Sequence, residues 1–198
     1  MRLSILIPTL PARFDLFQPL VQKLEKQIAD LGTDQVEILG LLDNKKSSVG
    51  RKRNQLLDLA QGEFLTFVDD DDDVSDDYIS QLLFALEVPD IDLVLYDVLL
   101  QYQQEPPRNQ AKEVRCRYDQ GLNNGRNIRP SFYEGPPAHT HAWRASKVKH
   151  LRFPDKNFGE DSDWSLRAKT FVEKVVRIDK TLYFYKFDKA RTETRDGR

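Results

Sequence analysis

Residues 64 to 77 read FLTFVDDDDDVSDD, an apolar stretch followed at once by a dense run of aspartates. The length and composition of Phe64–Val68 predict a buried β-strand. Seven of the nine residues from Asp69 to Asp77 are aspartates, and carboxylates this close together raise one another's pKa values unless a cation neutralises them. Oxygen ligands favour a hard cation such as Mg²⁺, Mn²⁺ or Ca²⁺. We therefore expect this loop to hold a divalent metal; the alternative is a solvated acidic turn that caps the next helix.

The stretches around this segment alternate between patterns typical of strands and patterns typical of helices. The predicted strands lie at residues 3–7, 36–42, 64–68 and 92–99, and the predicted helices at residues 16–31, 53–59 and 78–86. Such alternation favours parallel strands joined by right-handed crossovers. The sequence therefore predicts an α/β fold with a mostly parallel central sheet flanked by helices.

The chain changes character between Gln101 and Pro130, where polar residues dominate. Six basic residues of this stretch (Arg108, Lys112, Arg115, Arg117, Arg126 and Arg129) stand against three acidic ones, and we predict a loop-rich insertion. After it, residues 138–143 and 182–187 are predicted strands and residues 161–171 a predicted helix. We expect both halves to share one sheet, so that residues 1–198 form a single domain.

Composition excludes several classes of protein. The net charge of −2 provides no whole-chain field for nucleic acid or an anionic membrane. The one cysteine, Cys116, has no internal disulfide partner, as is typical of a reducing compartment. The first eight residues are too short for a secretory signal, and no apolar run reaches the roughly 18 residues of a membrane span. We therefore predict a cytoplasmic protein.

Acidic residues stand at three points where strands end or helices begin. Asp43 follows the second predicted strand, Asp69–Asp73 follows the third, and Glu160 and Asp161 begin the late helix. Ligands bind at the carboxyl edge of such sheets, so convergence of the three sites favours an active site there. Each has a structural alternative: Asp43 in a strand-ending turn, and Glu160 and Asp161 as partners of a helix dipole.

Four motifs occur in order along nearly the whole chain. Residues 4–9 read SILIPT, residues 53–54 are Arg-Asn, residues 62–72 read GEFLTFVDDDD and residues 159–164 read GEDSDW. This ordered set resembles glycosyltransferase family 2, in which GT-A folds bind nucleotide sugars. Residues 62–72 are similar to the family's signature Gly-Glu-Tyr-Ile-x-Phe-Leu-Asp-x-Asp-Asp, which includes an Asp-x-Asp motif.

The resemblance implies a fold, an activity and residue roles. It implies that residues 1–100 bind a nucleotide sugar, with UDP-sugar the expected donor, and that residues 101–198 bind the acceptor. Thr9, Asp43, Arg53, Asp69 and Asp70 are expected at the donor, Asp71 and Asp69 at a Mn²⁺ or Mg²⁺ ion, and Asp161 as general base. The implied reaction is metal-dependent transfer to a hydroxyl with inversion of the anomeric carbon.

Chemistry makes the same demands. A nucleoside diphosphate leaving group gains negative charge, which a metal bound by Asp71 would offset. An acceptor hydroxyl is a poor nucleophile until a carboxylate removes its proton, and Asp161 is of the right type. Arg51, Lys52 and Arg53 precede or begin a predicted helix, where a nearby anion would explain them; we expect Lys52 to be the solvated member.

The acceptor side depends on weaker patterns. We expect acceptor contacts from Asp72, Glu160, Trp164 and His141. His139 and His141 would share a face of the predicted strand, with a structural role as the alternative. Trp143 and Trp164 could each stack on a sugar ring. Core packing is an equal alternative for Trp143, whereas Trp164, three residues after Asp161, is the better candidate. The family often has a histidine near its carboxyl end, whereas residues 184–189 read FYKFDK. The third metal ligand is therefore open, and Lys186, Lys189 or Arg191 are alternatives for binding the diphosphate.

Two other functions are weighed against the transferase. A catalytically silent protein that binds a nucleotide sugar or divalent metal would not need Glu160 and Asp161. A nucleotidyltransferase usually begins with a glycine-rich phosphate loop, and residues 10–13 contain no glycine. The acceptor stays open among a glycan, a lipid-linked substrate and a modified nucleobase, and the basic stretch 108–129 permits an anionic one.

Overall fold

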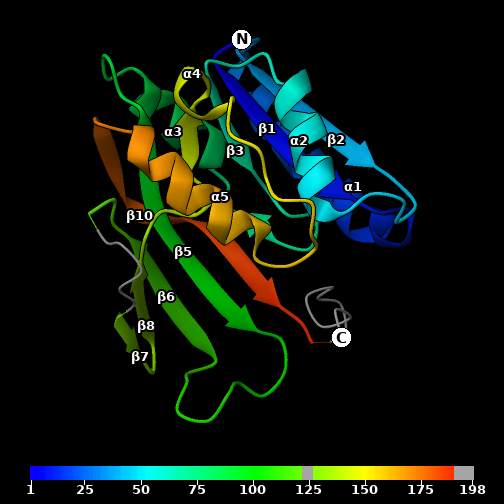
Figure 1. The fold of residues 1–198 in the computed structure, drawn as a ribbon, viewed down its shortest axis with the longest axis vertical. Coiled ribbons are helices and arrows are strands. Elements are labelled where there is room, and N and C mark those ends of the chain that lie inside the picture. The colour runs from blue at the N-terminus through cyan, green and yellow to red at the C-terminus, as the bar shows by residue number, and fades with distance from the viewer. Residues whose placement is uncertain (122–126, 190–198) are drawn as a thin grey trace.

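The computed structural model describes residues 1–121 and 127–189, which build one mixed sheet between two layers of helices (Figure 1). The strands are β1 (Leu3–Thr9), β2 (Val36–Leu42), β3 (Phe64–Phe67), β4 (Asp73–Val74), β5 (Leu93–Tyr102), β6 (Glu113–Tyr118), β7 (Asn127–Arg129), β8 (Phe132–Gly135), β9 (Ala142–Arg144) and β10 (Val175–Phe187). The helices are α1 (Phe14–Leu31), α2 (Val49–Leu59), α3 (Tyr78–Leu86), α4 (Ala145–Val148) and α5 (Glu160–Ala168), with short 3-10 helices η1 (Pro11–Arg13) and η2 (Lys169–Phe171).

The first half has the predicted α/β order. β1 lies between β2 and β3 and is parallel to both. β9 then joins β3 to β5 in antiparallel pairing, and β10 runs parallel to β5 over most of its length. More residue pairs in the sheet are parallel than antiparallel, which confirms the predicted class.

Alternating side chains of β1 build two cores. Leu3, Ile5 and Ile7 belong to a cluster with α1 and α3, whereas Leu6 belongs to a cluster with α2 and α5. A strand directs successive side chains to opposite faces, so a strand that is buried throughout, as β1 is, needs a helix layer on each side. Figure 1 shows α2 and α5 on the near face of the sheet.

Loops make up much of the polar stretch after residue 100, as predicted, but its described part also contains strands that the sequence patterns did not reveal. β5 continues to Tyr102 and pairs with β6, in which Val114 and Cys116 are buried while the residues beside them are exposed. This period of two is that of a half-exposed strand. Exposed residues dominate the composition of β6, which is why this strand was missed.

Two other predicted boundaries change where side chains point. The predicted strand 138–143 is only the short β9, because residues 139–141 form a turn in which the His141 N–H bonds to the Ala138 carbonyl oxygen (3.1 Å). The predicted strand 182–187 is the end of the longer β10. Helices α1 and α2 begin two and four residues earlier than predicted. No helix in the described ranges is long and apolar enough to cross a membrane.

Gly50 lets helix α2 contact the segment that leads to α5. A Cβ atom at this position would lie 1.9 Å from the Pro154 carbonyl oxygen, and the Gly50 N–H bonds to the Lys156 carbonyl oxygen (3.2 Å).

The substitution Gly50→Ala tests this close contact. Helix propensity alone would make the variant more stable by about 1 kcal/mol, but the clash is with backbone atoms, so we expect a net loss of stability. We expect this variant to lose about 1–3 kcal/mol of unfolding free energy in urea denaturation. Gln55→Ala, at an exposed site of α2, is the control; a Gly50→Ala protein as stable as this control would contradict the prediction.

Candidate active site

A pocket of 350 Å³ lies at the carboxyl ends of β1 and β3, within the size range of ligand-binding pockets. Its walls come from η1, α2, the aspartate loop after β3, the turn before β9, the start of α5, and β5, β6 and β10. The lining residues include Thr9, Arg13, Lys52, Arg53, Asp69, Asp70, Asp71, Asp72, Val98, Tyr118, His139, Phe158, Glu160, Asp161, Tyr183 and Tyr185. Segments far apart in the sequence thus meet at the predicted edge of the sheet.

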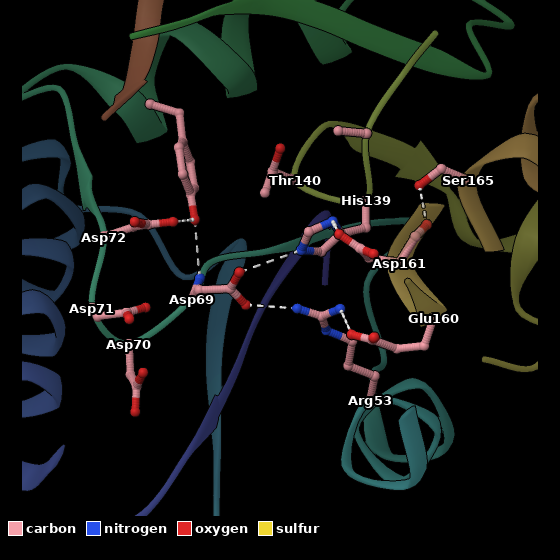
Figure 2. A network of polar contacts seen from close by, with 12 residues as sticks. Arg53, Asp69, Asp70, Asp71, Asp72, His139, Thr140, Glu160, Asp161 and Ser165 are labelled. Carbon is pink, nitrogen blue, oxygen red and sulfur yellow. Dashed lines mark hydrogen bonds and ion pairs between the residues drawn. The ribbon is translucent and has the colours of Figure 1, made fainter. Parts of the chain in front are cut away.

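The buried guanidinium of Arg53 joins two of these walls (Figure 2). Its Nη2 donates to Asp69 Oδ1 (2.8 Å) and its Nη1 donates to Glu160 Oε1. The rings of Phe67 and Phe153 lie beside it, at 5.8 and 5.7 Å. Burial by itself would raise the pKa of Asp69, but the Arg53 charge and His139 hold that pKa well below its usual range. Asp69 is therefore ionised. One oxygen of Glu160 is paired with Arg53, and the acceptor contact expected of this carboxylate stays a prediction.

His139 lies between Asp69 and Asp161, as Figure 2 shows. Its Nε2 is 3.6 Å from Asp69 Oδ2, and its Nδ1 is 3.7 Å from Asp161 Oδ2. The ring is buried, and Nε2 has no hydrogen-bond partner among the described residues. No local pattern in the sequence separates His139 from His141, because a turn and not the predicted strand determines their directions.

Asp70 and Asp71 share the charge of Arg13. The Thr9 hydroxyl donates to Asp70 Oδ2 (2.7 Å) and Arg13 Nη1 to Asp70 Oδ1 (2.7 Å), whereas Arg13 Nη1 lies 3.3 Å from Asp71 Oδ2. Burial, with help from Asp69 and Asp70, raises the pKa of Asp71 to about 6 although Arg13 opposes it. The cations of the protein therefore compensate Asp71 incompletely.

Asp72 fastens the aspartate loop to β10. The Tyr183 hydroxyl donates to Asp72 Oδ2 (2.6 Å), the Lys186 N–H donates to Asp72 Oδ1 (2.9 Å), and the same hydroxyl accepts the Asp69 N–H (3.1 Å). Burial and the neighbouring aspartates raise the pKa of Asp72 well above its usual value. Asp72 lines the pocket as the sequence analysis expected, but both of its oxygens already accept hydrogen bonds.

The residues present fit a divalent cation of the kind that shares its ligands with a substrate. In residues 1–121 and 127–189, no three His, Cys, Asp or Glu side chains form a ready metal cage. Mg²⁺-type sites commonly use one or two carboxylates and complete the shell with water and phosphate oxygens. Asp71, whose charge the cations of the protein compensate incompletely, supplies one such carboxylate. The nearby Asp69 is the second metal ligand that the sequence predicts.

The predicted donor residues lie around this centre with one exception. Thr9, Arg53, Asp69 and Asp70 line the pocket. Asp43 lies outside the lining set and accepts the N–H groups of Lys46 (2.9 Å) and Ser47 (2.8 Å), as in a strand-ending turn.

Lys52, expected to be solvated, is instead 3% exposed and lines the pocket. Its Nζ lies 3.2 Å from Asp43 Oδ1 and donates to the Thr9 carbonyl oxygen (3.3 Å). That expectation was wrong, because the end of β1 covers this face of α2. Lys52 thereby connects Asp43 to the pocket.

Two predicted acceptor residues are core residues. Trp164 is fully buried and stacks on Phe153, with ring centroids 4.8 Å apart. His141 is fully buried, where its Nδ1 accepts the Ala138 N–H (3.0 Å) and its Nε2 lies 3.2 Å from the Tyr96 carbonyl oxygen. Both predictions were wrong because these side chains point into the helix and sheet layers. Neither lines the pocket.

The three alternatives for binding the diphosphate have different outcomes. Lys186 Nζ lies 3.1 Å from Asp73 Oδ2, on the far side of the aspartate loop from the pocket lining. Lys189 is exposed, and its N–H donates to Gln104 Oε1 (3.0 Å). Arg191 lies outside the described residues.

Comparison with known proteins gives a family and a fold. Residues 15–150, more than half of the chain, match the model of the family described as Glycosyl transferase family 2. EpsH of Bacillus subtilis (strain 168), provisionally named a glycosyltransferase, is 26% identical over 182 residues, which cover 80% of this chain and 49% of EpsH.

Two solved structures of S. aureus TarS 1-349 have a similar fold. The complex with UDP-GlcNAc has a TM-score of 0.65 at 16% identity and covers 97% of this chain and 60% of that one. The complex with UDP has a TM-score of 0.63 at 16% identity and covers 95% and 61%. The chain thus spans about half of EpsH and three fifths of the TarS chain.

The burial of His141 makes stability depend on pH. Burial lowers the pKa of this imidazole from 6.5 to about 4, so the unfolded chain takes up a proton first as the pH falls. The folded state should lose about 3 kcal/mol of unfolding free energy from this group between pH 6.5 and 4. In urea denaturation across this range, His141→Gln should show a shallower loss than the wild type. The exposed His150→Gln should keep the wild-type slope, and equal slopes for all three proteins would contradict the prediction.

Proposed function

Because the chain belongs to glycosyltransferase family 2 and has the GT-A fold of TarS, we propose that it transfers a sugar from a nucleoside diphosphate donor to an acceptor hydroxyl. One observation carries the proposal: the ionised Asp69 and the undercompensated Asp71 lie across one pocket from Asp161. A group that holds the leaving group and a group that activates the nucleophile are what this reaction needs. TarS binds UDP and UDP-GlcNAc, which supports a UDP-sugar as the donor.

Residues of the first hundred are proposed to form the donor side. Asp71, with Asp69, would hold Mn²⁺ or Mg²⁺, and the ion would neutralise the charge that the diphosphate gains as its bond to the sugar breaks. Arg13 and Lys52 line the same wall and can donate hydrogen bonds to phosphate oxygens. Asp43 is paired with Lys52, which lines the pocket. A nucleotide base that contacts Asp43 would therefore lie next to Lys52.

Asp161 is proposed as the general base. It lies in the first turn of α5, where the helix dipole stabilises a carboxylate, and its Oδ1 accepts the Ser162 N–H (2.7 Å). Its side chain is 37% exposed, so an acceptor hydroxyl can reach Oδ2 and give up its proton there. Attack from this side, opposite the diphosphate, inverts the anomeric carbon. A catalytically silent binding protein would not need this carboxylate. We propose that residues 101–198 hold the acceptor and that the enzyme is cytoplasmic.

The metal site is tested by the thermal stability of Asp71→Ala. UDP-sugar with Mn²⁺ should raise the melting temperature of the wild type more than UDP-sugar alone, because a ligand that binds only the folded state stabilises it. Asp71→Ala should lose the Mn²⁺-dependent part of this shift. Asp76→Ala, whose carboxylate is 96% exposed, is the control. An unchanged shift in Asp71→Ala would show that other residues hold the metal.

The same measurement with GDP-, TDP- and CMP-sugars tests which nucleotide base the donor carries; a UDP-sugar should give the largest shift.

The general base is tested by Asp161→Asn, which keeps the shape of the side chain and removes its basicity. Transfer should slow by a factor of about 100 or more, while the thermal shift with donor and Mn²⁺ persists. Asp163→Asn changes the same helix two residues later, at a carboxylate paired with Arg167, and should transfer at close to the wild-type rate. UDP release at full rate from Asp161→Asn would contradict the assignment.

A further inference from the structure

The wall of the pocket beside Asp161 differs in chemistry from the donor wall. It is lined by Tyr118, Tyr185 and Phe158 together with Val98. Resting on the transferase function above, we propose that these aromatic side chains form an acceptor subsite for an uncharged saccharide. The subsite replaces the sugar-stacking role that the sequence analysis gave to Trp164.

Sheet register brings three of these side chains to one face. Val98 of β5 pairs with Tyr183 of β10 on one side and with Cys116 of β6 on the other. Tyr185 and Tyr118 each stand two positions further along their strands, and therefore on the same face as those partners. Tyr183 is buried and holds Asp72, whereas Tyr185 is 36% exposed. Tyr185 thus offers part of its ring and its hydroxyl to a ligand.

Phe158 supplies an aromatic edge at the rim. Its side chain is 69% exposed although it lines the pocket. The neighbouring Asn157 fixes this segment, because its Oδ1 accepts the Val49 N–H at the start of α2 (2.9 Å). An exposed aromatic ring held beside a pocket gains stability when a ligand covers it, and the apolar face of a sugar ring packs well on such surfaces.

The distribution of charge argues against an anionic acceptor. The lysine and arginine side chains that line the pocket are Arg13, Lys52 and Arg53, all from the donor wall and all ion-paired with aspartate or glutamate. From residue 98 onward, the described part of the chain contributes Glu160 and Asp161 to the lining and no lysine or arginine. A phosphate on the acceptor would therefore lie beside carboxylates, and the nearby Arg53 and His139 already face Glu160, Asp69 and Asp161. Such a placement is unfavourable in a partly buried site.

The described basic residues between 108 and 129 do not correct this imbalance. Two of them, Arg115 and Arg117, pair with Asp97 and Asp179, and none of the basic residues described in that stretch lines the pocket. Hydroxyl groups suit the site better, because they donate hydrogen bonds to carboxylates and carry no charge that a cation must compensate. Burial raises the pKa of Tyr185, and the neighbouring aspartates raise it further, so its hydroxyl stays neutral and able to donate.

The experiment compares matched acceptors with the complete chain, Mn²⁺ and the UDP-sugar that gives the largest thermal shift. UDP release is measured with methyl glycosides of neutral hexoses and N-acetylhexosamines, and with the 6-phosphates of the same glycosides. Neutral glycosides should accelerate UDP release above hydrolysis by water, and their phosphates should do so at least about tenfold less. Saturation-transfer NMR with the same glycosides gives a binding readout without donor.

Side-chain variants test the aromatic surface itself. Phe158→Ala and Tyr185→Ala should each raise the acceptor KM about tenfold, which corresponds to about 1.4 kcal/mol, with little change in donor KM. Tyr185→Phe keeps the ring, and its acceptor KM should lie between those of Tyr185→Ala and the wild type. Phe84→Ala removes a ring that is 79% exposed on α3, outside the pocket lining, and should leave the acceptor KM unchanged.

The outcomes separate this inference from the proposed function. UDP release by water or by phosphorylated glycosides, with no acceleration by any neutral saccharide, would overturn the acceptor subsite and leave the transferase standing. Equal acceptor KM values for Phe158→Ala, Tyr185→Ala and Phe84→Ala would also overturn it. Failure of every nucleotide sugar to bind or turn over would overturn both.

Discussion

A single buried guanidinium, that of Arg53, is the interaction on which the pocket depends. It comes from α2, and its Nη atoms hold Asp69 after β3 and Glu160 at the start of α5. Removing one partner from a buried ion pair typically costs about 3–5 kcal/mol, because an uncompensated charge stays behind. The rings of Phe67 and Phe153 cover the guanidinium and limit the access of water. The walls that we propose for donor and acceptor therefore share a fixed arrangement before a ligand arrives, and such preorganisation favours catalysis.

The aspartate loop divides its charges between structure and chemistry. Asp70 accepts hydrogen bonds from Thr9 and Arg13, and Asp72 accepts them from Tyr183 and a β10 amide. These bonds fix the backbone of the loop. Asp71 keeps a pKa of about 6 because burial and neighbouring carboxylates disfavour its charge. Folding therefore leaves an electrostatic deficit at the point where we propose a divalent cation, and perturbed groups of this kind cluster at functional sites.

The last strand explains why the two walls differ. β10 runs beside β5 and pairs with β4, directly after the aspartate loop. Tyr183 on this strand holds the loop, and Tyr185 two residues later lines the pocket where we propose the acceptor subsite. One strand thus fastens the charged wall and supplies part of the aromatic wall. This division fits a reaction in which one substrate carries a diphosphate and the other, by our inference, carries no charge.

The sequence by itself determined the strand and helix order of the first half and the meeting of Asp69 with Asp161. Hydrophobic periodicity is local, and parallel strands bring their carboxyl ends to one edge wherever they pair. Only the tertiary structure decided that Lys52 is buried and that His141 and Trp164 belong to the core. The direction in which a side chain points is local, but what it meets there depends on elements packed from distant parts of the chain. The burial of a side chain, its ion pairs and its access to a ligand all depend on this packing.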